Sequence, residues 1–337
     1  MGEKTERRQG CYLVISVNRN AMRIVREVIG RADDLNVRVL KTSNGATVID
    51  MGIEAAGGWE AALRFVDISL GGLGRSSLSI RKIKDLDIPV LHVFTDHPLI
   101  SCLCSQISGW VLKGAEGPDG IAPLGSGPAR AVARRDKFIT EFDYADRCED
   151  VVLLLQMDRI PDENIAAVVA DGCQVSPEHV YLLAARTGSV VGSANVSSRT
   201  LETSIWRLHE LGFDLNRVIA AWGEAPVAPY CDDELTAMVR VNTFVYYGGC
   251  AGFVVDGDDD ELRRITPLMP LSPQTCPDYH IGFAELFERA GRDIFKMDTF
   301  VHSVARVTIY NRRTGAVFSA GEPDEEMLYA SLKWRPK

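Results

Sequence analysis

Apolar and polar positions along the chain follow two periods that alternate. A spacing of three to four residues between apolar side chains is typical of helices that pack one face against a core. It predicts helices over residues 21–32, 59–70, 99–108, 161–172, 193–211 and 233–241. Short, mostly apolar runs indicate strands instead. They predict strands over residues 37–40, 46–50, 88–95, 151–157, 180–184, 218–222, 244–247 and 253–256.

Turn and cap residues add detail to this pattern. Asn44-Gly45 stands between the first two predicted strands and is a strong hairpin signal, because both residue types tolerate the positive φ of a tight turn. Asn18 or Asn20 is the predicted N-cap of the first helix. Residues 116–128 are rich in Gly and Pro and are typical of a linker.

The alternation of strands and helices predicts an α/β fold with partly parallel sheets. The length of 337 residues fits two domains of ordinary size. We expect two α/β domains with mixed sheets, an N-terminal one over residues 1–145 and a C-terminal one over residues 146–337. Whether the first exchanges segments with the second is left open.

Composition narrows the function class. With 37 basic and 46 acidic residues the formal net charge is −9, which argues against a nucleic-acid partner. The eight cysteines form no C-x-x-C pair and are scattered along a large chain, and such scattering is typical of reduced thiols in an intracellular protein. No apolar run is long enough for a membrane span, and the chain start carries no targeting signal. We therefore expect a cytoplasmic enzyme with a small organic substrate.

A glycine-rich turn at residues 124–131 is the first candidate for ligand binding. Gly125 and Gly127 flank Ser126, and a predicted helix start carries Arg130. Backbone N–H groups at such a turn can bind an anion, and an arginine adds positive charge. The turn is neither a P-loop nor a dinucleotide-binding motif. An ordinary strand-to-helix turn explains the pattern equally well, so both interpretations stay open.

The helix predicted over residues 193–211 carries the second candidate. Arg199 and Glu202 are three residues apart, so their side chains can meet on one helix face. From spacing alone, a surface ion pair of small energetic effect is the favoured interpretation. A serine hydrolase is disfavoured, because Ser193 does not stand in a G-x-S-x-G motif.

Asp96 and His97, at the end of a predicted strand, form the third candidate, with Gln106 and Lys113 downstream. His92 lies upstream, but the set lacks the histidine pair at i,i+4 of familiar zinc sites. A structural role for His97 at the turn is the favoured interpretation. We predict no metal.

Several separated stretches occur in a fixed order from about residue 18 to residue 320. They are Asn44-Gly45-Ala46-Thr47-Val48-Ile49-Asp50, Gly71-Gly72-Leu73-Gly74, Thr95-Asp96-His97-Pro98, residues 124–131, Val191-Gly192-Ser193, Arg199 with Glu202, Tyr247-Gly248-Gly249 and Phe295-Lys296-Met297-Asp298. Taken together, these stretches resemble the methenyltetrahydromethanopterin cyclohydrolase family.

The resemblance implies hydrolysis of a methenyl bridge to a formyl group on a tetrahydromethanopterin-type carrier, with no cofactor. It also implies a homotrimer of two-domain subunits with a pocket between the domains. The methenyl carbon belongs to an amidinium cation and is already electrophilic, so it needs a positioned water and a base. Glu202 is the expected base, and Arg199 would hold it in place and keep it ionised.

The expected substrate contacts come from several parts of the chain. They are Asp96, His97, Gln106, Lys113, Ser126, Gly127, Arg130, Ser193, Asn195, Arg240 and Asn242. Lys113 and the turn around Gly127 are expected to contact the anionic tail of the carrier or polar groups near the pterin. Methanogenic and methylotrophic hosts both fit this chemistry.

The chain departs from the family pattern at three places. Before Tyr247, Arg240 and Asn242 match, but Thr243 stands where the family carries an acidic residue. Asn195 replaces a glutamine, and residues 301–305 differ from the usual Phe-Ser-Pro-Ala. Two alternatives stay open, namely a paralogue that binds a pterin without turnover and a related one-carbon enzyme such as a formyl transferase.

Overall fold

The computed structural model describes residues 15–117, 122–291, 296–297 and 303–335. Phe295 and Asp298 of the C-terminal motif, and positions 301–302, lie outside the described residues.

The chain forms two compact units, each built from separate stretches of sequence. The first unit extends to Gly74 and resumes at Ile100–Arg186, and the second comprises Arg75–Leu99 and the residues from Thr187 onward. These compact units therefore do not divide at residue 145. A segment from the N-terminal part of the chain, residues 75–99, belongs to the second unit.

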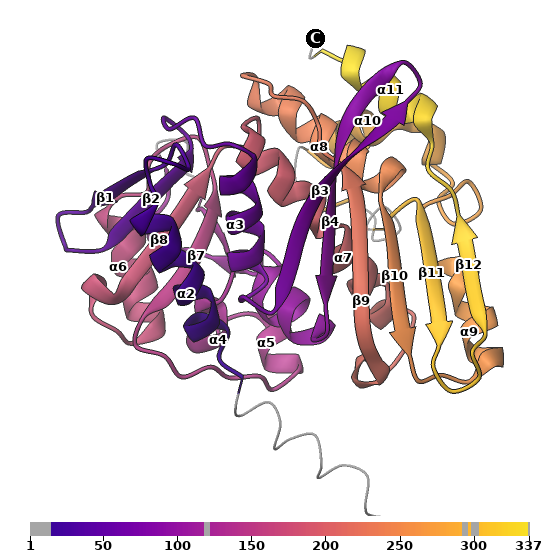
Figure 1. Cartoon of the computed structure of the whole chain (residues 1–337), viewed down its shortest axis with the longest axis horizontal. Coiled ribbons are helices and arrows are strands. Elements are labelled where there is room, and N and C mark those ends of the chain that lie inside the picture. Colours follow the sequence, from indigo (N-terminus) through magenta and orange to yellow (C-terminus); the bar gives the residue numbers. More distant parts are fainter. Residues whose placement is uncertain (1–14, 118–121, 292–295, 298–302, 336–337) are drawn as a thin grey trace, which may run out of the picture. The chain divides into compact units, whose positions relative to one another are not determined.

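Six strands form the sheet of the first unit, in the order β1-β2-β8-β7-β6-β5 (Figure 1). They are β1 Arg38–Lys41, β2 Thr47–Gly52, β5 Trp110–Val111, β6 Leu124–Ser126, β7 Val151–Gln156 and β8 Val180–Ala185. β2, β8 and β7 are parallel, whereas β1, β6 and β5 are antiparallel to their neighbours. The hairpin predicted at Asn44-Gly45 joins β1 and β2, and Gly45 has a φ of 95°. The mixed α/β character is confirmed.

Helices alternate with these strands along the chain. They are α2 Val17–Gly30, α3 Trp59–Ser69, a π-helix at Leu99–Gln106, α4 Ala129–Ala133, α5 Lys137–Glu141 and α6 Glu163–Cys173. In Figure 1, α2 and α3 lie on the face of the sheet turned toward the viewer. Strand residues such as Leu153 share one buried cluster with Trp110 and with Val169 of α6. Burial of this apolar surface is the main stabilisation of the unit.

The N-cap predicted for the first helix was wrong. Ser16 occupies the cap, and its side chain accepts a hydrogen bond from the Arg19 N–H at 3.1 Å. Asn18 lies inside the helix, and its buried amide donates to the Pro128 carbonyl at 2.8 Å. Asn18 also accepts from the Val152 N–H at 3.0 Å, so its side chain ties α2 to β7 and to the start of α4.

Six strands also form the sheet of the second unit, in the order β12-β11-β10-β9-β4-β3. They are β3 Gly74–Ile83, β4 Leu86–Thr95, β9 Val218–Pro226, β10 Cys250–Val255, β11 Arg306–Asn311 and β12 Val317–Gly321. β10 and β11 are parallel, whereas β9 is antiparallel to both β4 and β10. This sheet is therefore mixed as well.

The helices of the second unit are α7 Val190–Glu210, α8 Glu234–Gly248, α9 Asp259–Ile265, α10 Phe283–Arg289 and α11 Glu325–Lys333. α7 packs against β9, β4 and β10, and α8 packs against α7 and α11. The strand predicted at residues 244–247 was wrong, because these residues form the last turns of α8. Nearly every residue of α8 from Thr236 to Gly248 is buried, and a short apolar run alone does not distinguish a buried helix from a buried strand.

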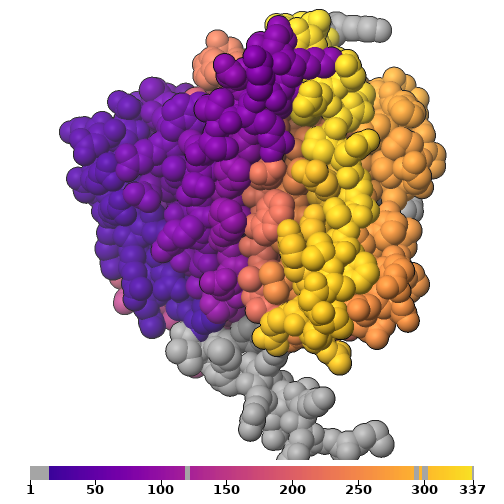
Figure 2. Space-filling view, turned by 45° about the vertical axis from the view of Figure 1, so that its right-hand side comes forward, coloured from indigo at the N-terminus to yellow at the C-terminus, as the bar shows by residue number. Residues whose placement is uncertain are grey.

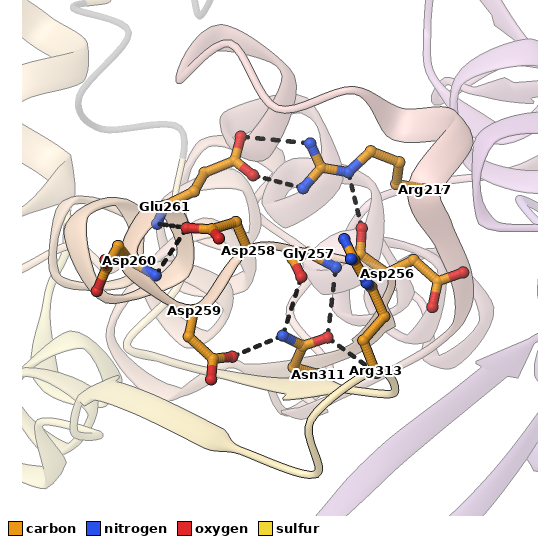
Figure 3. Close-up of polar contacts among 9 residues, drawn as sticks. All are labelled: Arg217, Asp256, Gly257, Asp258, Asp259, Asp260, Glu261, Asn311 and Arg313. Atoms are coloured by element: carbon orange, nitrogen blue, oxygen red, sulfur yellow. Dashed lines mark hydrogen bonds and ion pairs between the residues drawn. The ribbon is translucent and has the colours of Figure 1, made fainter.

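Acidic residues follow β10 and form a tight polar loop (Figure 3). Asp258 caps α9 by accepting a hydrogen bond from the Glu261 N–H at 3.2 Å. Asn311 exchanges hydrogen bonds with the backbone of Gly257 at 3.1 and 3.3 Å, and Arg217 forms an ion pair with Glu261. The loop therefore holds β10, α9 and β11 together.

In the described part of the chain, one face of the second sheet is left uncovered by helices. Gly223 of β9 faces α7, so the adjacent Trp222 points to the opposite face, where its register partner is Phe94. Phe94, Tyr310 and Val317 are 54%, 39% and 58% exposed. Figure 2 shows the C-terminal strands, in yellow, at this surface. No described helix combines the length and the apolar character that a membrane span requires.

His179, directly before β8, provides a pH-dependent contact in the first unit. Its Nδ1 lies 2.9 Å from Asp150 and its Nε2 lies 3.1 Å from Glu149. The hydrogen bond to Asp150, together with the charges of Glu149, Asp150 and Glu178, raises the pKa of His179 above its ordinary value of 6.5. The charged imidazole therefore contributes its full stabilisation of the folded protein at pH values below 6.5. This stabilisation is lost as the pH rises through the folded-state pKa.

Replacing His179 by glutamine should therefore lower the melting temperature at about pH 5.5 and change it little at about pH 9. Thermal unfolding of the wild type and the variant at both pH values measures this. An equal loss at both values would contradict the contribution of the charged imidazole.

Candidate active site

The start of α7 is fixed by local hydrogen bonds. Ser189 caps the helix by accepting from the Gly192 N–H at 3.0 Å. The Glu234 carboxylate accepts from the N–H groups of Thr187 and Gly188, at 3.0 and 3.2 Å. A Cβ at Gly188 would lie 1.7 Å from the Cys231 carbonyl oxygen, so only glycine fits this turn. The 21-residue helix is thus anchored at its N-terminus.

Arg199 and Glu202 meet on α7 as the spacing predicts. The guanidinium Nη1 lies 2.8 Å from Glu202 Oε2, and the side chains are 16% and 9% exposed. This low exposure differs from the surface pair that spacing alone favoured. A neighbouring guanidinium favours the charged form of a carboxylate, and a carboxylate in that form can accept a proton. The pair therefore has the chemistry of a general base with its positioning partner.

Ser193 and Asn195 precede this pair on the same helix. The Ser193 hydroxyl donates to the Ala228 carbonyl at 2.7 Å, and Asn195 is 2% exposed. The Ser197 hydroxyl likewise donates to the Pro226 carbonyl, at 2.9 Å. These bonds fix the first half of α7 to the end of β9, so the described contact of Ser193 is structural.

Arg240 and Asn242 lie on α8, where their polar groups contact the protein itself. Arg240 donates to the Leu332 carbonyl at 2.8 Å, near the end of α11, and burial lowers its pKa. Asn242 donates to the Met238 carbonyl one turn earlier, at 2.8 Å. Thr243 also bonds one turn back, to the Val239 carbonyl. These contacts stabilise α8 and its packing against α11.

Asp96 and His97 follow β4 and are exposed. The His97 N–H donates to the Thr95 hydroxyl at 3.1 Å, which forms the turn after the strand. Among residues 15–117, 122–291, 296–297 and 303–335, no three His, Cys, Asp or Glu side chains are placed to hold a metal ion.

In the first unit, the predicted glycine-rich turn connects β6 to α4. Gly127 has a φ of 98°, and a Cβ there would lie 2.4 Å from the Leu154 side chain, so this position requires glycine. The Gly127 N–H donates to the Ser105 carbonyl at 2.8 Å, and Ser126 is 3% exposed. One backbone N–H of this turn is therefore already hydrogen-bonded within the protein.

Arg130 is fully buried and bonded on all sides. Its Nε and Nη2 lie 3.0 and 2.8 Å from the two carboxylate oxygens of Asp136, and its Nη1 donates to the Ser105 carbonyl at 2.9 Å. The guanidinium therefore has no surface for a ligand, and its geometry favours a structural role over an anion contact. Asp136 was missed from the sequence, although an Asp directly before Lys137-Phe138 is a recognisable N-cap signal, and it caps α5.

Gln106 and Lys113 differ in their surroundings. The Gln106 amide is fully buried and donates to the Ser69 hydroxyl at 3.1 Å. Lys113 is exposed, after β5. Of the candidates in the first unit, Lys113 alone combines a positive charge with solvent exposure.

Comparison with known proteins identifies the family of the chain. A sequence model of the family described as "Cyclohydrolase (MCH)" matches residues 16–332. The methenyltetrahydromethanopterin cyclohydrolase of Methanocaldococcus jannaschii is 36% identical over 326 residues, which cover 95% of this chain and 99% of that protein. The enzymes of the same name from Methanococcus maripaludis and Methanosarcina barkeri are 38% and 34% identical, over 95% of this chain in each case and 99% and 98% of their own lengths. The chain therefore belongs to the methenyltetrahydromethanopterin cyclohydrolase family.

Proposed function

We propose that the chain catalyses the hydrolysis of methenyltetrahydromethanopterin, or a close analogue, to the formyl compound. The observation that carries the proposal is the shielded Arg199–Glu202 pair in a chain that is similar to cyclohydrolases over 95% of its length.

In the proposed reaction, a water molecule adds to the electrophilic methenyl carbon and loses a proton to the Glu202 carboxylate. The neutral adduct then collapses. Its hydroxyl becomes the formyl carbonyl, one C–N bond breaks, and the released nitrogen takes up the hydroxyl proton. The methenyl cation and water thus give the formyl compound and one proton. Glu202 also stabilises the cationic substrate by its charge, and Arg199 keeps the carboxylate oriented.

Oxygen-18 water tests the reaction type. Incubation of the protein with methenyltetrahydromethanopterin and no other substrate should give formyl product, at a rate above that of buffer, with one labelled oxygen by mass spectrometry. A product that forms only when a second acceptor is added would favour the formyl transferase. Binding of the pterin without accelerated product formation would favour the inactive paralogue.

Exposed or turn-forming candidates remain proposals for substrate contacts. They are Lys113, Ser126, Gly127, Asp96 and His97. The other proposed contacts are buried residues on helices, namely Ser193, Asn195, Gln106, Arg240 and Asn242. Lys113 is the strongest of these, because an exposed lysine can pair with an anionic tail of the carrier.

Replacing Lys113 by alanine should raise KM about five- to tenfold and leave kcat within about twofold, because the lost contact is equal in ground and transition states. Steady-state kinetics measures both constants. Lys137→Ala, which also removes an exposed lysine of the same unit, is the control and should change neither. A fall in kcat alone for Lys113→Ala would contradict a role in binding.

The assembly we propose is a homotrimer in the cytoplasm that serves one-carbon metabolism. The uncovered face of the second sheet, with exposed Phe94, Tyr310 and Val317, supports burial against another subunit. The seven cysteines in the described part of the chain are free thiols, which fits a reducing compartment. Sedimentation equilibrium should give the mass of three 37.1-kDa chains, and the mass of one chain would contradict the trimer.

A further inference from the structure

Ser79, His92 and Glu224 form a chain of polar contacts across three neighbouring strands of the second sheet, β3, β4 and β9. The Ser79 hydroxyl oxygen lies 2.7 Å from His92 Nε2, and His92 Nδ1 lies 3.3 Å from Glu224 Oε2. His92 and Glu224 are register partners, so their side chains share one face of the sheet. A hydroxyl, an imidazole and a carboxylate in this order are the groups of a serine-hydrolase triad.

Glu224 determines which nitrogen of the neutral imidazole carries the proton. An ionised carboxylate only accepts hydrogen bonds, so the nitrogen beside it, Nδ1 of His92, carries the N–H. Nε2 then directs its lone pair toward the Ser79 hydroxyl, as a general base requires. The other carboxylate oxygen of Glu224 pairs with Arg81 of β3, which holds the carboxylate in place.

The nucleophile of this group is accessible, whereas its base is shielded. β3 is an edge strand of the sheet, and Ser79 is exposed. The side chains of His92 and Glu224 are 23% and 17% exposed. Arg81 follows Ser79 by two residues, so both side chains point to the same face of the strand. The partly exposed guanidinium of Arg81 therefore provides positive charge for an oxyanion that forms next to Ser79.

Cys250 of β10 lies next to this group but is not its nucleophile. It is the register partner of Glu224 and is 1% exposed. Burial raises the pKa of its thiol, so the thiolate that attack requires is disfavoured. Arg306 of β11 approaches the Cys250 sulfur, with 3.7 Å between Nη2 and Sγ. The contacts therefore assign the nucleophilic role to Ser79.

We propose that Ser79, His92 and Glu224 form a second catalytic site, which hydrolyses small carboxylic esters through an acyl-serine intermediate. This activity is additional to the proposed reaction at Glu202. Phe94 follows His92 by two residues on β4 and is 54% exposed, so it offers an apolar surface to the acyl group. An open sheet surface favours a small acyl group, because it has little area to bind a long one.

The reaction has two steps. In the first, the Ser79 oxygen bonds to the ester carbonyl carbon, and its proton passes to His92 Nε2. The ester C–O bond then breaks, and the leaving oxygen takes that proton to become the alcohol. In the second step, water adds to the acyl carbon and gives a proton to His92. The acyl–Ser79 bond breaks, and the serine oxygen takes the proton back. Ester and water thus give acid and alcohol.

Hydrolysis of 4-nitrophenyl acetate tests the site, with Ser77→Ala as the matched control. Ser77 lies two residues before Ser79 on β3 and is also exposed. The wild type should release nitrophenol at least about tenfold faster than buffer. Ser79→Ala and His92→Gln should each lower this excess rate about tenfold or more, and Ser77→Ala should keep it within about twofold. Mass spectrometry after a short incubation should find an acetyl group on Ser79.

A wild-type rate equal to that of buffer, or equal rates for the wild type and Ser79→Ala, would overturn the second site. An acetyl group found only on other residues would overturn it as well. The assay uses the assembled protein, so a Ser79 that another subunit covers gives the same negative result. If His92→Gln melts below the assay temperature, Ser79→Ala decides, because it removes one exposed hydroxyl.

Loss of methenyl absorbance on the same samples separates this site from the proposed function. Ser79→Ala should keep the wild-type rate of that reaction within about twofold. Activity on the methenyl compound without ester hydrolysis overturns the second site alone. Ester hydrolysis that depends on Ser79, without activity on the methenyl compound, supports the second site and overturns the proposed function.

Discussion

Replacing Glu202 by glutamine is expected to lower kcat for hydrolysis of the methenyl compound by about 100- to 10,000-fold, with a small change in KM. Glutamine keeps the shape of the side chain but cannot accept the proton that the attacking water loses. The 2.8 Å contact with Arg199 is replaced by a weaker one to a neutral amide, so the geometry is largely kept. Stopped-flow absorbance of the methenyl group measures the effect.

Glu210→Gln is the matched control on the same helix. Glu210 is three residues from Arg207, as Glu202 is from Arg199, with 3.6 Å between the charged atoms and 26% exposure of the Glu210 side chain. This variant removes a carboxylate of the same type and spacing and should keep kcat within about twofold. Equal activity of Glu202→Gln and wild type would rule out Glu202 as the base.

The largest expected effect on stability comes from Asp136→Asn. This change leaves the fully buried Arg130 charge without its carboxylate partner and should lower the free energy of unfolding by about 3–5 kcal/mol. It also weakens the cap of α5, because Asp136 accepts hydrogen bonds from the Phe138 and Ile139 N–H groups. Urea unfolding of the purified variant measures the loss.

Asp143→Asn is the control for this second prediction. Asp143 pairs with Arg134 at 2.8 Å, but the side chains are 82% and 43% exposed. Removal of an exposed partner should change the free energy of unfolding by less than about 1 kcal/mol. If both substitutions have the same small effect on the free energy of unfolding, the buried Arg130–Asp136 pair does not stabilise the fold as its burial indicates.

Local signals in the sequence predicted most elements. The Asn44-Gly45 hairpin and the apolar runs that became β7 and β8 were confirmed, because turn chemistry and an unbroken apolar run depend on neighbouring residues alone. Arg199 and Glu202 could be paired from the sequence for the same reason, since helical geometry fixes contacts three residues apart.

Features that depend on distant residues were not predictable in this way. The helix at residues 244–247 was mistaken for a strand because nearly every residue of α8 from Thr236 onward is buried, so the run shows no polar face, and α8 packs against α7 and α11. Residues 75–99 belong to the second unit because β4 pairs with β9, more than a hundred residues later in the chain. Periodicity contains no information on such pairing.

The burial of individual side chains could not be predicted from the sequence either. Arg130 follows a glycine-rich turn and fits an anion site by sequence, but its partners are Asp136 and the carbonyl of Ser105 from another segment.

The most direct test of the central claim is the initial rate of methenyl absorbance loss when purified wild-type protein is mixed with methenyltetrahydromethanopterin. We predict a rate that increases linearly with protein concentration and exceeds the buffer rate, with one proton released per formyl product. A rate equal to that of buffer at every protein concentration would contradict the assignment of this chain as a cyclohydrolase.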